Sequence, residues 1–250
     1  MRETITVTGM VLSAAPIGEY DRRIVLLTKE RGKIAAFAKG ARKTGSSLLT
    51  AVNPFAFGTF LLYEGKNSYN MMQADISNYF SELRTDVEGA YYGFYFLDLA
   101  GYYTREGNDE TDMLKLLYQT MRALTSPKIP KELIRYIFEL KSITINGEGP
   151  EVFQCAECGE KENLAVFSVK KGGLLCKNCR EQDRYGVGLD NSTLYTLQYI
   201  VGAPPERMYN FIVNEEVLSK LRKIVTRYME HYIGREFKSL EILKQITSCS

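Results

Sequence analysis

The sequence contains little of what most catalytic sites are built from. It has a single histidine, His231, among 250 residues. It has no P-loop pattern for phosphates and no G-x-S-x-G elbow for a nucleophilic serine. A metal-dependent nuclease needs clustered carboxylates or histidines that leave coordination positions open, and a lone histidine does not supply them. We therefore expect a binding protein rather than an enzyme, and no role in chemistry for His231.

Long hydrophobic runs are missing as well. No window approaches the roughly 18 uncharged apolar residues that a membrane span needs. Residues 1–11 are charged and alternate in polarity, and they lack the apolar core and cleavage site of a secretion signal. We therefore expect a cytoplasmic protein with no membrane partner. Its hydrophobic share of 45% and its charged share of 25% are ordinary for a globular chain.

The first 80 residues carry the alternating pattern of short β-strands. We expect strands at Thr4–Ser13, Arg22–Lys29, Lys33–Lys39, Phe55–Tyr63 and Tyr69–Ile76. The segment 30–32 between the second and third strands suits a hairpin turn. Five short strands favour a closed barrel, because closure leaves no unpaired sheet edge. An SH3-like barrel fits this periodicity as well as an OB-fold does, so the pattern alone does not choose between them.

After residue 80 the pattern becomes helical. We expect helices at Asp86–Arg105, Glu110–Leu124, Lys131–Ile143, Asn191–Val201, Asn214–Ile233 and Lys238–Ile246. Aromatic residues crowd the first of these helices over 91–103 and cannot share one face. We expect them to fill a core, with a groove for a partner peptide as the alternative. The expected fold class is α+β, with a barrel domain at 1–80 and a helical domain at 81–250.

Four of the five cysteines form two close pairs. Cys155-x-x-Cys158 is followed, after 17 residues, by Cys176-x-x-Cys179. In a reducing cytosol this spacing indicates a metal site rather than disulfides. Four thiolates favour a closed, structural Zn²⁺ site; an iron–sulfur cluster, a redox dithiol and four ordinary reduced thiols are the alternatives. We expect a module over about residues 150–188, with a β-hairpin between the pairs, and assign no role to Cys249.

Positive charge concentrates in one stretch, although the net charge is only +2. Residues 20–45 hold 8 basic residues against 2 acidic ones. They fall in the predicted hairpin and in the loop that follows it. Lysine and arginine side chains in such a loop displace counterions from a phosphate backbone, and OB barrels bind single strands in such grooves. The alternative is an ordinary solvated surface.

Taken together, these features resemble the RecO family of bacterial recombination mediators. The cues are the two cysteine pairs, the C-terminal run 231–240, and the barrel segments Gly32-Lys33-Ile34 and Lys39-Gly40-Ala41-Arg42. They span nearly the whole chain and follow the family's order. The cysteine set is the most specific of these cues.

The resemblance implies an N-terminal OB-fold, a helical domain and an embedded zinc module held by the four paired cysteines. It also implies a cytoplasmic, nucleoid-associated protein that binds and anneals single-stranded DNA. Such a protein helps to load RecA onto strands coated by single-strand-binding protein. RecR and the C-terminal tail of single-strand-binding protein are then the expected partners. The DNA-binding surface maps onto six basic residues: Arg22, Arg23, Lys33, Lys39, Arg42 and Lys43.

Two hypotheses of other classes stand beside the mediator. One is a nuclease, which the shortage of suitable ligands disfavours. The other is a zinc-containing adaptor that binds only protein. Such an adaptor would share the helical and cysteine parts but would not need the basic hairpin.

Overall fold

The computed structural model describes residues 4–65 and 68–248 of the chain. The chain divides into two compact units, Met1–Ser126 with Phe237–Ser250, and Pro127–Glu236. The boundary predicted near residue 80 separates the barrel from the helices, whereas these units are divided by compactness. The predicted boundary stays a prediction. No helix in the described part of the chain is long and apolar enough to span a membrane.

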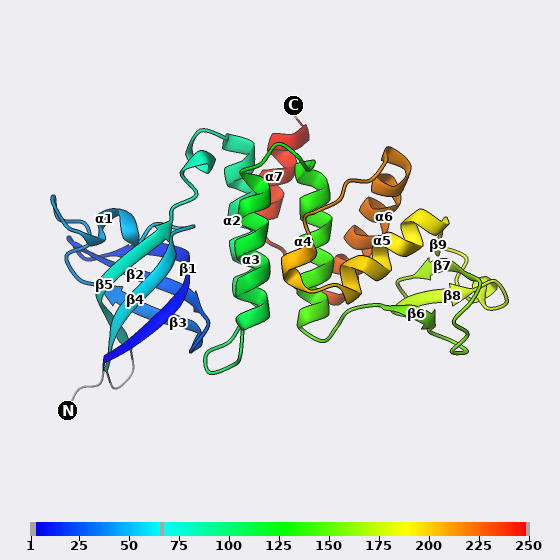
Figure 1. The fold of residues 1–250 in the computed structure, drawn as a ribbon, viewed down its shortest axis with the longest axis horizontal. Helices are drawn as coiled ribbons and strands as arrows, with labels where there is room; N and C mark the ends of the chain where they lie inside the picture. Colours follow the sequence, from blue (N-terminus) through cyan, green and yellow to red (C-terminus); the bar gives the residue numbers. More distant parts are fainter. Residues whose placement is uncertain (1–3, 66–67, 249–250) are drawn as a thin grey trace. The chain divides into compact units, whose positions relative to one another are not determined.

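Five strands close a barrel in the first unit (Figure 1). They are β1 (Thr4–Ile17), β2 (Asp21–Thr28), β3 (Gly32–Ala38), β4 (Phe57–Glu64) and β5 (Tyr69–Asn78). Around the barrel the order is β1-β2-β3-β5-β4, and β3 pairs with β5 in parallel. Insertion of β5 between β3 and β4 makes this an OB-type Greek-key barrel rather than a simple meander. The predicted five-stranded OB barrel is confirmed.

The first strand extends further than predicted. β1 continues to Ile17 instead of ending at Ser13, with a shift of register between Val11 and Ser13. Such a bulge bends a strand, so β1 pairs with β4 along its first half and with β2 along its second. At Gly9 a Cβ atom would lie only 2.3 Å from the carbonyl oxygen of Leu27, which excludes any larger residue there.

The barrel interior is filled by aliphatic and aromatic side chains. The largest of these include Ile24, Leu26, Ile34, Phe60 and Leu62, none of them more than 1% exposed. The connections contain short elements, α1 (Leu48–Ala51) between β3 and β4, and the 3-10 turn η1 (Ser81–Arg84) after β5. The sequence pattern did not predict either, because four residues are too few to show helical periodicity.

Helices α2 (Val87–Tyr103) and α3 (Thr111–Leu124) pack against strands of the barrel. Asp86 caps α2, accepting a hydrogen bond of 2.9 Å from the backbone N–H of Gly89. Tyr92, Tyr95 and Phe96 are buried, which confirms the predicted core role for most of the aromatic stretch. Phe94 departs from that role, because 42% of it is exposed.

The last helix returns to the first unit. Helix α7 (Lys238–Ser248) packs along α2, as Figure 1 shows. The buried ring of Phe237 meets Tyr95 and Tyr102 edge-on, with centroid distances of 5.9 and 5.6 Å. Ser239 donates a hydrogen bond of 2.8 Å to the carboxylate of Asp98. A segment remote in sequence thus completes the core around α2.

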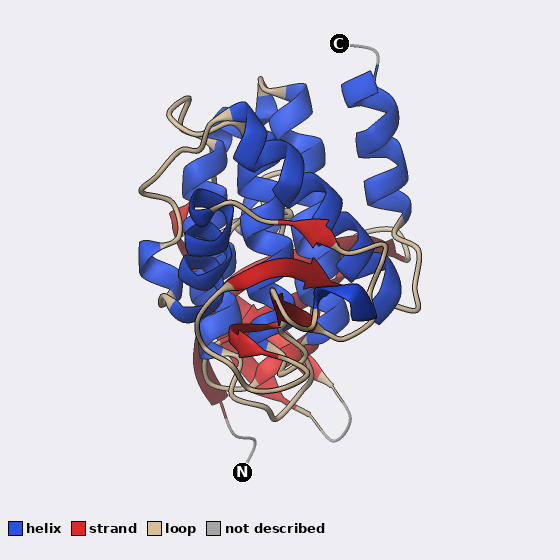
Figure 2. Ribbon diagram, turned by 90° about the vertical axis from the view of Figure 1, so that its right-hand side faces the viewer, coloured by secondary structure: helices blue, strands red, loops and turns tan. Residues whose placement is uncertain are grey.

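The second unit combines three helices with a small sheet, drawn blue and red in Figure 2. The helices are α4 (Lys131–Ile145), α5 (Asn191–Gly202) and α6 (Glu215–Tyr232), with 3-10 turns η2 (Arg180–Gln182) and η3 (Pro205–Arg207). The strands β6 (Glu151–Cys155), β7 (Leu164–Ser168), β8 (Gly173–Cys176) and β9 (Val187–Gly188) form a sheet in the order β6-β8-β7-β9. Arg222 of α6 donates two hydrogen bonds to the Glu132 carboxylate of α4, which joins these helices and lowers the pKa of Glu132.

We expect Phe237→Ala to lower the free energy of unfolding by about 3–5 kcal/mol, the usual cost of removing a buried phenylalanine ring. The loss arises because Tyr95 and Tyr102 lose their shared edge-on neighbour. Urea unfolding followed by far-UV circular dichroism measures it, since the chain has no tryptophan. Phe237→Leu, which keeps apolar volume, should lose clearly less. An unchanged midpoint for Phe237→Ala would contradict a packing role for this ring.

Candidate metal centre and nucleic-acid interface

The small sheet of the second unit brings the two cysteine pairs together. β6 ends at Cys155 and β8 ends at Cys176, and the two strands pair in parallel. Parallel strands have their carboxyl ends at the same edge, so both Cys-x-x-Cys turns begin side by side. β7 and β8 form the antiparallel hairpin predicted between the pairs. Gly159, at φ 76°, closes the first turn in a conformation that favours glycine.

The four sulfur atoms have the separations of a tetrahedral metal site. All four lie within 4.8 Å of one another, and the sulfurs of Cys158 and Cys176 are 3.8 Å apart. A metal–sulfur bond of about 2.3 Å places tetrahedral sulfurs about 3.8 Å apart. A disulfide needs about 2.05 Å, so these are free thiols rather than oxidised pairs. The cluster has the geometry to bind a metal ion.

The surroundings of the cluster stabilise negative charge on sulfur unevenly. Burial raises the pKa of the Cys155 thiol, but backbone N–H groups, including that of Cys176 at 3.4 Å, outweigh burial and lower the pKa to about 6. A hydrogen bond with Cys158, together with burial, raises the pKa of Cys179 to about 12. A cation among the four sulfur atoms would offset the repulsion between thiolates.

A separate group of residues forms a basic surface at one end of the barrel. We define this basic surface as Arg22, Arg23, Lys39, Arg42 and Lys43, five of the six predicted DNA-binding residues. Pairing of Arg22 with Ala38 places the start of β2 beside the end of β3, where the loop begins. The loop is held to the β1–β2 turn by hydrogen bonds from Gly40 N–H to the Asp21 carboxylate, 2.7 Å, and from Arg42 N–H to the Tyr20 carbonyl, 2.9 Å. All but the half-buried Arg22 are exposed.

Lys33 does not lie with this group. It sits near the other end of β3, five residues before Ala38, a rise of about 17 Å along a strand. Its ammonium group donates a hydrogen bond to the Gly101 carbonyl of α2. The sequence pattern placed the six residues in one hairpin and the loop that follows it, but it did not show which end of the hairpin each one lies near.

Sequence reasoning also missed a residue that positions the basic surface. Asn53, in the connection between α1 and β4, accepts a hydrogen bond of 2.6 Å from the Arg22 guanidinium. The two residues are 31 positions apart, and nothing in the local sequence pairs them.

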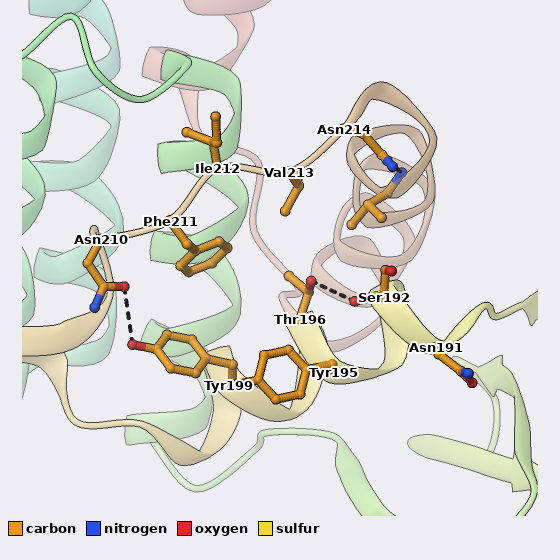
Figure 3. A pocket seen from close by; sticks show the side chains of 11 residues that line it. Asn191, Ser192, Tyr195, Thr196, Tyr199, Asn210, Phe211, Ile212, Val213 and Asn214 are labelled. Carbon is orange, nitrogen blue, oxygen red and sulfur yellow. Dashed lines mark hydrogen bonds between the residues drawn. The ribbon is translucent and has the colours of Figure 1, made fainter.

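The second unit contains a pocket of about 620 Å³ between the start of α5 and the segment 210–214 (Figure 3). Tyr195, Tyr199 and Phe211 line it, and Tyr199 donates a hydrogen bond of 3.2 Å to the Asn210 side chain. None of its eleven described lining residues carries a charge. This pocket therefore suits an uncharged group and lacks the cations that a phosphate backbone requires.

Comparison with known proteins finds one family along nearly the whole chain. The families described as "Recombination protein O N terminal" and "Recombination protein O C terminal" match residues 1–80 and 84–241. A DNA repair protein RecO from Alkaliphilus metalliredigens is 34% identical over 244 residues, covering 97% of this chain and 99% of the relative. Proteins of the same name from Exiguobacterium sibiricum and Bacillus subtilis are 31% and 28% identical. The alignment with the Exiguobacterium protein covers 95% of this chain and 95% of that relative. The alignment with the Bacillus protein covers 96% of this chain and 94% of that relative.

We expect purified protein to carry about one metal ion per chain and Cys176→Ser to reduce this to near zero, since a closed site needs all four thiolates. Elemental analysis of the purified proteins measures the metal content. Cys249→Ser is the matched control and should retain the metal; Cys249 lies outside the described residues. Equal metal content in Cys176→Ser and wild type would contradict a site built on this cluster.

Proposed function

Because the chain belongs to the RecO family of DNA repair proteins, we propose that it is a recombination mediator that binds and anneals single-stranded DNA. In this role it helps to load RecA onto strands coated by single-strand-binding protein, and it acts by binding rather than by catalysis. The observation that carries the proposal is the basic surface, an exposed group of cations at one end of an OB-type barrel. OB barrels bind single strands through such cationic grooves.

The proposed mechanism is electrostatic. Lys39, Arg42 and Lys43 approach the phosphates and release condensed counterions, which supplies affinity without reading sequence. Arg22, fixed by Asn53, presents its guanidinium from a defined position. Neutralising the phosphates of two strands reduces their repulsion, and base pairing then selects the complementary partner. Lys33 was predicted to join these contacts, and its role in DNA binding stays a prediction.

Zinc is the metal that we propose for the cysteine cluster. Four thiolates in tetrahedral positions match its preferred ligands and geometry, and they leave no position open for water or substrate. Bound zinc would therefore hold the two Cys-x-x-Cys turns together without taking part in a reaction. Glu157 in the first turn already forms an ion pair of 2.6 Å with Lys171 beyond β7, which holds that turn against the hairpin.

RecR and the C-terminal tail of single-strand-binding protein are the proposed protein partners, with RecA affected indirectly. The alternative function is a zinc-containing adaptor that binds these proteins but not DNA. The basic surface favours the mediator, because an adaptor has no need to gather exposed cations at one end of a barrel.

We expect Arg42→Glu with Lys43→Glu to weaken binding to a single-stranded oligonucleotide by at least about tenfold at moderate salt. The slope of log affinity against log salt should become shallower by at least about 1.4, since each contact on a single strand contributes about 0.7. Fluorescence anisotropy with a labelled oligo-dT at several salt concentrations measures both quantities.

The matched control is Lys29→Glu with Arg31→Glu, the same change of charge on exposed residues at the opposite end of the hairpin. It should bind DNA nearly as wild type does. If the two double variants lose affinity equally, net charge rather than the basic surface governs binding. If wild-type protein shows no salt-dependent binding to single strands, the adaptor is the better description.

A further inference from the structure

An open groove of about 600 Å³ lies in the first unit, where the connection before β4 faces η1 and the start of α2. We call it the aromatic groove. Six of its lining residues matter here: Phe55, Tyr79, Phe80, Arg84, Tyr91 and Phe94. None of the proposed contacts of the basic surface includes these residues.

The backbone is strained on two sides of the aromatic groove. Phe55 and Phe80 have φ angles of 76° and 47°, in the left-handed region that residues other than glycine rarely adopt. Among the described residues other than glycine, only Asn163 also has a positive φ angle. Gly93 of α2 leaves room for the Phe55 ring, since a Cβ there would come within 2.8 Å of it. Strained conformations persist where surrounding structure enforces them, and they concentrate at binding sites.

Aromatic surface remains open to solvent in the aromatic groove. Phe94 is 42% exposed and Tyr79 is 39% exposed, although the other large rings of α2 are mostly buried. The Phe94 ring lies 4.9 Å from that of Phe55 and 6.4 Å from that of Tyr91, measured between centroids. The buried Phe55 ring supports Phe94 from one side and leaves part of its surface exposed. Such a supported, half-open ring is a platform for a planar ligand.

Positive charge at the edge of the aromatic groove favours a planar ligand that also carries negative charge. Arg84 lines the aromatic groove and is exposed, and none of the described lining residues is acidic. Asn53 also lines it and holds the guanidinium of Arg22, a member of the basic surface. Through Asn53 the aromatic groove therefore adjoins the basic surface. A nucleic-acid strand bound along the cations would pass Asn53 and reach the exposed rings of Tyr79 and Phe94. A ligand with both phosphates and planar groups matches this combination.

We propose that the aromatic groove binds unpaired bases of single-stranded nucleic acid by stacking on Phe94, while Arg22 and Arg84 contact the adjoining phosphates. The inference rests on the proposed function and adds a base-stacking site on the first helix after the barrel. Stacking tolerates every base, because each has a π face.

The test uses full-length protein and two oligonucleotides of equal length, an oligo-dT and the same backbone with its central nucleotides abasic. For Phe94→Leu we expect affinity for oligo-dT to fall by about tenfold. We expect an unchanged salt slope and little loss on the abasic strand, since no phosphate contact is removed. Phe94→Tyr, which keeps the ring, should restore binding to oligo-dT.

Tyr195→Leu, a change at an exposed ring in the uncharged pocket of the second unit, is the matched control and should bind as wild type. Wild-type affinity of Phe94→Leu for oligo-dT overturns the stacking site while leaving the proposed function intact. Equal losses on both oligonucleotides overturn it too, because they indicate damage to phosphate contacts or to the fold. If Phe94→Leu keeps its affinity for DNA but loses binding to an acidic peptide with an apolar C-terminus, the aromatic groove is a peptide site instead.

Discussion

Closure of the barrel is the constraint on which the arrangement of the first unit depends. A five-stranded sheet left open would expose unpaired backbone groups at two edges. The parallel pairing of β3 with β5 removes those edges, but it also puts β5 between β3 and β4. The chain must therefore cross from β3 past β5 before it reaches β4. That crossing carries the cationic loop, α1, Asn53 and Phe55. One topological requirement therefore places Lys39, Arg42 and Lys43 of the basic surface on the same connection as one wall of the aromatic groove.

The second unit uses parallel pairing for a different purpose. Two strands that run in the same direction deliver their ends to one edge, and here each end is the first cysteine of a pair. The two cysteine pairs are separated by 17 residues in sequence, and the parallel pairing of β6 with β8 brings them together in space. The sulfur atoms thus approach one another through backbone hydrogen bonding. A bound ion would add to an arrangement that the strands already specify, and the thiols would need little rearrangement to bind it.

The features encoded locally were predictable from the sequence, and those that depend on tertiary pairing were not. The two Cys-x-x-Cys pairs and the β2–β3 hairpin each depend on residues a few positions apart. The full length of β1 depends on a bulge that lets one strand serve two neighbours. The position of Lys33 depends on a carbonyl group 68 residues away. Phe94 looked like one more core residue, because a helix that is apolar on every side gives no sign of which ring is left uncovered.

The return of α7 to α2 has a consequence for the order in which the chain folds during synthesis. The barrel strands and α2 leave the ribosome early, but the helix that covers α2 follows about 135 residues later. At 5–20 residues per second, translation leaves that side of α2 bare for roughly 7 to 27 s. In that interval the nascent chain presents Tyr95 and Tyr102 to chaperones and to other unfinished chains. The first unit to emerge is thus the last to be completed.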